Sequence, residues 1–264
     1  MKHSYTIDET GIMLHSLPTE KLDLLLAWVD NSFRVCVCGN QPNEIIFFRH
    51  YTFYQTHNFN DALHELKAIV SSDVLFANVY RQVKIGISGR MELTPKDFYK
   101  NTEALHISSE IATGEIVGAI AIDHAVQEFY NAFFPNAQYE LLPLKWLEYI
   151  SPKGDARKLF VQIDGNLLHI AYFRAPDKLQ FYNTFEFKAS EDFAYFTNLV
   201  AQNLELKGDE TELVLSGDVA QPSKIYDIAF AYFQKILFLQ NNTVEYSSLF
   251  TNYPKHQNIA LFSL

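Results

Sequence analysis

The sequence predicts a duplicated α/β protein with two lobes, each holding a mixed sheet flanked by helices. Two segments, beginning near residues 24 and 158, share one order: three apolar runs separated by turns, an amphipathic stretch, and a fourth apolar run ending in Ser-Gly. The spacing also recurs, because 59 residues separate Asp30 from Gly89 and 53 separate Asp164 from Gly217. Internal duplication is the economical account of both observations.

In the first segment, apolar runs at residues 24–29, 33–38 and 44–54 predict a three-stranded antiparallel meander, with turn-forming residues at 39–43. Residues 60–70 place apolar side chains at helical spacing, and 83–88 read as a fourth strand. The second segment repeats this with strands at 158–163, 167–173, 179–187 and 211–216. Its helix begins near residue 190, with Ser190 as the expected N-cap.

Between the two units we expect a strand at 115–121, a helix at 122–134 with Asp123 in its first turn, a short strand at 139–142 and a helix at 143–150. Turn-forming residues at 151–155 then mark a boundary. The predicted division is therefore a first lobe over residues 1–150 and a second lobe over 151–264.

Composition bounds the kind of protein. Of 264 residues, 48% are hydrophobic, which supplies two cores and excludes a disordered chain. The net charge of −10 and the absence of clustered Lys and Arg argue against a nucleic-acid partner. No run reaches about 18 apolar residues, the start lacks a signal-peptide pattern, and Cys36 and Cys38 read as reduced core thiols. We therefore expect a soluble, cytoplasmic protein without a membrane span.

The duplicated order, with an aspartate (Asp30, Asp164) ending the first strand of each unit, resembles the actin-like ATPase (ribonuclease-H-like) superfamily. The pattern is similar overall to an uncharacterised Bacteroidetes family with this fold and no assigned function. Residues 141–147 also resemble the segment that links the halves of pilus-assembly actin homologues. The resemblance covers about residue 22 to the end. It implies two lobes across a cleft, with each first hairpin around nucleotide phosphates and its aspartate helping to hold Mg²⁺.

The loops depart from that family's pattern. The first phosphate loop normally reads Asp-x-Gly-Ser/Thr, but Ser32 stands in the glycine position here. The second normally reads Asp-x-Gly-Gly-x-Thr, and the adenosine loop normally opens with glycines; here polar or apolar side chains replace glycines in both. Glycine is needed where backbone approaches phosphate closely. The candidate cofactor-binding residues that the resemblance implies are Asp30, Ser32, Asp164, Gly165, Asn166 and Gly217.

These departures favour a non-catalytic interaction or scaffold protein without catalytic residues or a bound cofactor, in which Asp30 and Asp164 only cap turns. The alternative is an ATPase or switch that still binds ATP and Mg²⁺ through both aspartates. A third, weaker hypothesis is a small-molecule kinase of the sugar-kinase type. No motif of a serine hydrolase, P-loop, dinucleotide fold or zinc protease occurs.

The expected partner is another protein, including a second copy of the chain. The apolar residues 259–264 should be docked in the protein's own core, as an edge strand packed in the second lobe, or against that partner.

Overall fold

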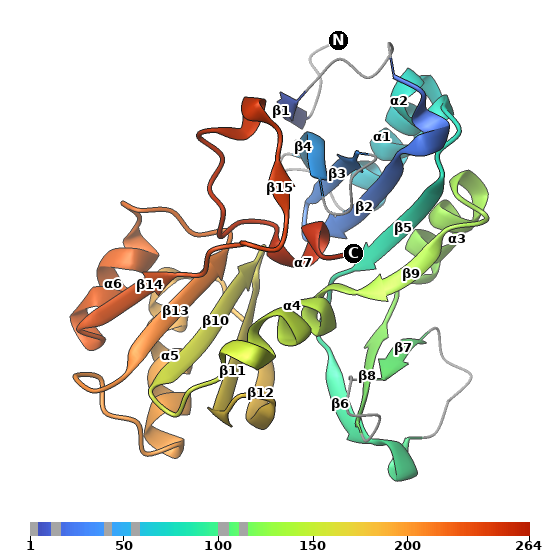
Figure 1. Cartoon of the computed structure of the whole chain (residues 1–264). Helices are drawn as coiled ribbons and strands as arrows, with labels where there is room; N and C mark the ends of the chain where they lie inside the picture. Colours follow the sequence, from blue (N-terminus) through green and yellow to red (C-terminus); the bar gives the residue numbers. More distant parts are fainter. Residues whose placement is uncertain (1–4, 12–16, 40–43, 54–58, 100–105, 111–115) are drawn as a thin grey trace.

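The computed structural model describes residues 5–11, 17–39, 44–53, 59–99, 106–110 and 116–264, and it contains two large sheets and one small sheet (Figure 1). The first sheet runs in the order β1 (Tyr5–Gly11), β4 (Glu44–Phe53), β3 (Ser32–Cys38), β2 (Asp23–Val29), β5 (Gln82–Ile87) and β9 (Gln138–Leu141), and β15 (Glu245–Tyr246) pairs with β4. The predicted turn at 39–43 lies, from residue 40 on, outside the described residues.

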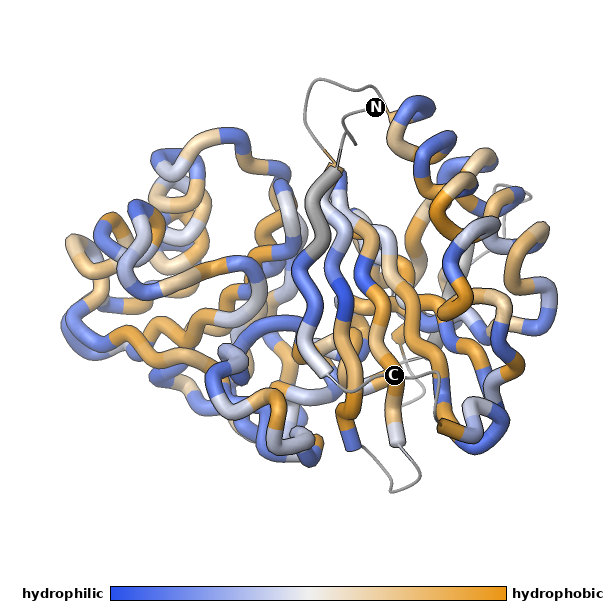
Figure 2. Tube along the Cα trace, turned by 90° about the horizontal axis from the view of Figure 1, so that it is seen from above, coloured by the Kyte–Doolittle hydropathy of each residue, from blue (hydrophilic) through white to orange (hydrophobic). Residues whose placement is uncertain are grey.

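The first sheet is covered on both faces, which explains why β2 and β3 are buried at almost every position. Helices α1 (Phe59–Ser72), α2 (Val74–Ala77) and α3 (His124–Phe133) cover one face, where the ring of Phe33 contacts those of Phe76 and Phe129. On the other face, Phe48 contacts Tyr253 and Phe262 from the end of the chain. Figure 2 shows hydrophobic residues concentrated along these strands.

The second sheet has five strands in the order β12 (Lys178–Glu186), β11 (Leu167–Ala175), β10 (Lys158–Asp164), β13 (Glu212–Gly217) and β14 (Lys235–Phe238). Helices α5 (Ser190–Asn203) and α6 (Lys224–Tyr232) pack on one face of it. The expected N-cap of α5 is wrong by one residue: Ala189 holds that place, and the carboxylate of Asp192 accepts its N–H at 3.0 Å.

A small third sheet, in the order β6 (Glu92–Pro95), β8 (Ile116–Ala121) and β7 (His106–Glu110), lies between β5 and α3 in the chain and projects from the first lobe (Figure 1). The sequence predicted β8 and missed its two partners. It did predict the cap of α3, since Asp123 accepts the N–H of Ala125 at 2.8 Å.

Helix α4 (Leu142–Ile150) joins the lobes (Figure 1). Its fully buried Trp146 belongs to an apolar cluster that holds most of the first lobe's core together with Phe160 and Val214 of the second sheet. The Trp146 indole also donates to the Ser216 hydroxyl at 3.1 Å. A second cluster lies in the second lobe alone. The lobes therefore share one continuous apolar core, which opposes their separation.

The end of the chain returns to the first lobe. β15 extends the first sheet, and the four residues of α7 (Ile259–Phe262) are buried in the shared core. The edge strand in the second lobe that we expected over residues 259–264 is therefore wrong. Because these apolar residues are consecutive, a strand would have needed apolar contacts on both faces, and a short, fully buried helix satisfies them instead. The division at residue 150 stays a prediction.

The two large sheets differ in size: the second has five strands, whereas β1 and β15 bring the first to seven. Both cysteines are buried and unbonded, in line with the prediction, and burial holds the pKa of the Cys36 thiol well above its usual value. Within the described part of the chain, no helix is long and apolar enough to cross a membrane.

Candidate functional site

The tips of the two first hairpins meet between the lobes. Asp30 begins the β2–β3 turn with φ 51°, and Gly165 begins the β10–β11 turn with φ 60°. A Cβ placed on Gly165 would lie 2.5 Å from the Cβ of Asp30, so the two turns touch. Two-residue hairpin turns of this kind need a positive φ at the first position, which glycine and aspartate tolerate better than most residues.

The two aspartates are not equivalent, although both were expected to end a first strand. Val29 pairs with Ser32 in the first hairpin, so Asp30 lies in the turn. Asp164 pairs with Leu167 in the second hairpin, so it is the last residue of its strand. The two aspartates were expected at equivalent positions, but Asp30 lies one residue further along its hairpin than Asp164 does. The two-residue turn fixes the strand register in each hairpin.

Arg34 is the centre of the inter-lobe site. It lies on β3, and its side chain is only 5% exposed. Its Nη2 donates to Oδ2 of Asp218 at 2.7 Å, and its Nη1 lies 3.5 Å from Oδ1 of Asp164. Nη1 also donates to the side-chain oxygen of Asn258 at 2.9 Å. One guanidinium from the first lobe thus binds β10, the loop after β13 and the C-terminal segment.

Each carboxylate in this group is bound by more than Arg34. The hydroxyl of Ser88, which follows β5 in the first lobe, donates to Oδ2 of Asp164 at 2.6 Å. Oδ2 of Asp218 also accepts the backbone N–H of Gly165 at 2.9 Å. Asp164 is therefore held by two residues of the opposite lobe, and Asp218 bridges Arg34 to the second hairpin.

Burial and charge oppose each other at this site. Burial raises the pKa of Asp164 above its usual value, while the Arg34 guanidinium acts to lower it. For Arg34 itself, burial lowers the pKa, but Asp218 and Asp164 together raise it above its usual value. The guanidinium therefore stays charged and compensates the buried carboxylate, as a buried ion must be compensated.

The remaining space cannot hold a nucleotide. The cavity between Arg34, Asp164 and Gly217 has a volume of about 10 Å³, roughly that of one water. Magnesium in proteins needs octahedral oxygen ligands and usually keeps several waters. The Arg34 guanidinium already binds Asp164, one of the two aspartates that such an ion would use, and the described residues hold no group of three or more potential metal ligands. The residues present do not fit ATP with Mg²⁺.

The other predicted residues shape turns. The Ser32 hydroxyl donates to the carbonyl of Val29 at 2.8 Å, and Asn166 is exposed, with its carbonyl accepting the N–H of Phe187. Gly217 has φ 84°, and a Cβ there would lie 1.9 Å from the carbonyl oxygen of Ile163. The structure therefore brings Asp164, Gly165 and Gly217 around the inter-lobe site and leaves Asn166 outside it.

Sequence reasoning missed Arg34, Ser88 and Asn258. A signal existed for Arg34: it is the only charged residue in β3. A lone arginine in an otherwise apolar strand must be paired if it is buried.

The architecture is that of solved proteins with an actin-like ATPase fold. A Bacteroides thetaiotaomicron protein described with that fold and unknown function has a TM-score of 0.73 and 17% identity, over 96% of this chain and 98% of the other. A chain of the PilM–PilN type IV pilus biogenesis complex has a TM-score of 0.60 and 12% identity, over 94% and 98%. The ethanolamine utilization protein EutJ from Carboxydothermus hydrogenoformans gives 0.50 and 9%, over 91% and 89%.

The fold predicted from the sequence is thus confirmed: the chain has an actin-like ATPase fold with two lobes. It belongs to the family described as "Protein of unknown function (DUF3822)", which matches residues 14–236. No curated protein matches the sequence.

Proposed function

We propose that this protein is a non-catalytic member of the actin-like ATPase fold that acts by binding another protein. The observation that carries the proposal is the position of Arg34, whose guanidinium lies between Asp164 and Asp218. At Asp164, this internal cation takes the role that the resemblance gives to bound Mg²⁺. The ion-pair network then fixes the two lobes without any ligand.

Opening the site for ATP would be costly for two physical reasons. The Arg34 side chain would have to leave a buried carboxylate uncompensated, which in proteins costs several kcal/mol. The lobes would also have to separate at α4, where Trp146, Phe160 and Val214 share one apolar core. Both features support a fold that is permanently closed.

The likeness to the PilM–PilN complex supports a protein partner, because that neighbour's fold is found in a complex. We propose the same use of the fold here, in the cytoplasm, with a partner that is a different protein.

The proposal is tested by thermal denaturation with 5 mM ATP and 10 mM MgCl₂, on the wild-type chain and on Asp164→Asn. ATP at a concentration of 100 times its Kd would add about 2.7 kcal/mol to the free energy of unfolding. In a chain of this size that is a rise in Tm of roughly 5–10 °C. We expect no rise.

A rise in the wild-type chain that Asp164→Asn abolishes would overturn the proposal and support the ATP-binding switch instead. Phosphate release from ATP at a rate that the same substitution removes would do so as well.

A further inference from the structure

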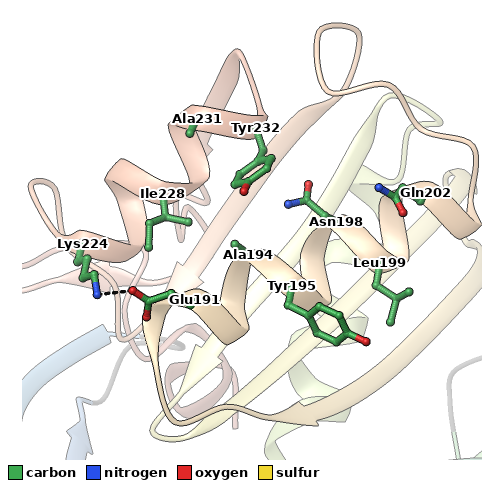
Figure 3. Close-up of a pocket in the computed structure, with 10 residues that line it drawn as sticks. All are labelled: Glu191, Ala194, Tyr195, Asn198, Leu199, Gln202, Lys224, Ile228, Ala231 and Tyr232. Atoms are coloured by element: carbon green, nitrogen blue, oxygen red, sulfur yellow. Dashed lines mark hydrogen bonds and ion pairs between the residues drawn. The ribbon is translucent and has the colours of Figure 1, made fainter.

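A groove runs along the outer face of the second lobe between α5 and α6. Its volume is about 710 Å³. Figure 3 shows both helices beginning near Glu191 and Lys224 and running in the same general direction, α5 toward Gln202 and α6 toward Tyr232, so that they diverge along the groove. The groove is therefore a channel with a defined direction.

The groove is lined mainly by apolar and aromatic side chains, and its polar lining residues are Glu191, Asn198, Gln202 and Lys224. Tyr195 and Tyr232 are 62% and 54% exposed, and Leu199 is 37% exposed. The smaller side chains of Ala194 and Ile228 lie between the helices and leave room above them (Figure 3). Large aromatic side chains around small ones are typical of sites where a partner inserts its own apolar residues.

One end of the groove is electronegative. Both α5 and α6 finish there, and neither has a basic residue in its last turn to offset the helix dipole. The loop after α5 adds Glu205, Asp209 and Glu210, and its one cation, Lys207, pairs with Glu210 at 3.0 Å. This loop lies against the end of α6, because the N–H of Gln234 donates to the carbonyl of Gly208 at 3.2 Å.

The size of the face limits what it binds. The fourteen residues of α5 give a length of about 21 Å and the nine of α6 about 14 Å, and each helix is about 10 Å wide, so the face covers roughly 350 Å². A stable dimer buries about 800 Å² on each partner. The groove is thus too small to hold a second copy by itself, and it matches the length and width of one helix.

We propose that the α5–α6 groove binds an amphipathic helix of a partner protein, antiparallel to both helices. The apolar face of that helix packs on Tyr195, Leu199 and Tyr232. Its amino-terminal end, preceded by Lys or Arg residues, lies over the electronegative end of the groove. In this placement the dipole of the partner helix points opposite to the dipoles of α5 and α6, which is favourable. The Lys or Arg residues of the partner then lie near Glu205 and Asp209. The inference rests on the proposed function and names the partner's chemistry.

The test uses two synthetic, fluorescently labelled 16-residue peptides with one leucine-rich face. The first has two lysines ahead of its first turn, and the second has two glutamates there. Fluorescence anisotropy measures their binding to the wild-type chain, to Leu199→Glu, and to Leu249→Glu, a matched change at a distant leucine that is 52% exposed. Circular dichroism confirms that each variant is folded.

We expect saturable binding of the lysine peptide to the wild-type and Leu249→Glu chains, and at least tenfold weaker binding to Leu199→Glu. The glutamate peptide should bind at least fivefold more weakly than the lysine peptide, and Asp209→Lys should reverse that preference. The absence of saturable binding, equal affinities for the two peptides, or an unchanged affinity in Leu199→Glu would overturn the proposal. So would sedimentation showing a dimer that Leu199→Glu dissociates, since a second copy would then occupy the groove.

These outcomes are independent of the ATP titration. If the chain binds both the lysine peptide and ATP, the proposed function is refuted and the proposed binding site in the groove stands. If it binds neither, only the proposed binding site in the groove is refuted.

Discussion

Replacing Arg34 with methionine tests the ion-pair network directly. Methionine keeps most of the apolar stem of arginine and removes the charge, so the packing loss is small. Asp164, whose side chain is 5% exposed, then loses its compensating cation, whereas Asp218, at 33%, is solvated by water. Removing one partner of a buried ion pair costs about 3–5 kcal/mol. Because Ser88 still donates to Asp164, we expect about 3 kcal/mol at pH 7.5.

The pH dependence of this loss has a defined sign. Burial already raises the pKa of Asp164, and removing Arg34 raises it further. A carboxyl whose pKa is higher in the folded than in the unfolded state weakens the fold as pH rises from the unfolded value to the folded one. The deficit of Arg34→Met should therefore be largest at neutral pH and should shrink by more than half at pH 4.5.

Equilibrium unfolding in urea measures both effects, and Arg157→Met is the matched control. Arg157 is 74% exposed and pairs with Asp155 on the surface, so its loss should leave the stability nearly unchanged. Combining Arg34→Met with Asp164→Asn removes the uncompensated charge and should restore most of the loss. If Arg34→Met is as stable as the wild type at pH 7.5, or if Asp164→Asn gives no rescue, the ion-pair network does not hold the lobes together.

Three further predictions follow from other buried groups. His169 is fully buried, and desolvation lowers its pKa to about 3. The wild-type chain should therefore lose stability as pH falls below about 6.5. The Tm of His169→Gln should change less with pH than that of the wild type. Phe262→Ala, which removes a buried ring against Phe48, should cost about 3–5 kcal/mol in urea unfolding, and a loss under 1 kcal/mol would contradict the docking of α7. Gly217→Ala forces a Cβ onto the Ile163 carbonyl, so Tm should fall by several degrees; an unchanged Tm would contradict this backbone geometry.

The repeated order of strands and helices could be predicted because both lobes use local signals: apolar runs, turn residues and helical spacing. These signals correctly predicted β2, β3, β4 and β5 in the first sheet and β10 to β13 in the second, but not β14. β1 was missed because its sequence alternates polar residues with few apolar ones, and its strand pairing with β4 is a long-range contact. β6 and β7 of the small sheet were missed for the same reason.

The site was predictable only in part. Asp164 and Gly217 were found because the resemblance places them in loops that contact phosphate. Arg34 belongs to no loop of that pattern, and its partners Asp164, Asp218 and Asn258 lie 130, 184 and 224 residues away in the chain. A single sequence gives no sign of which distant carboxylate a buried cation will meet, so the closure of the site required the structure.

The return of the chain to the first lobe has a consequence for synthesis. β15 pairs with β4 across about two hundred residues, and α7 completes the core beside β2. The first lobe therefore cannot finish folding on the ribosome until residues up to 262 have emerged, whereas the second sheet is complete once β14 has been made. At roughly 5–20 residues per second, the early strands wait on the order of ten seconds or more with an unfilled apolar face. During that interval the nascent chain is a substrate for chaperones, and its first half is the part they must protect.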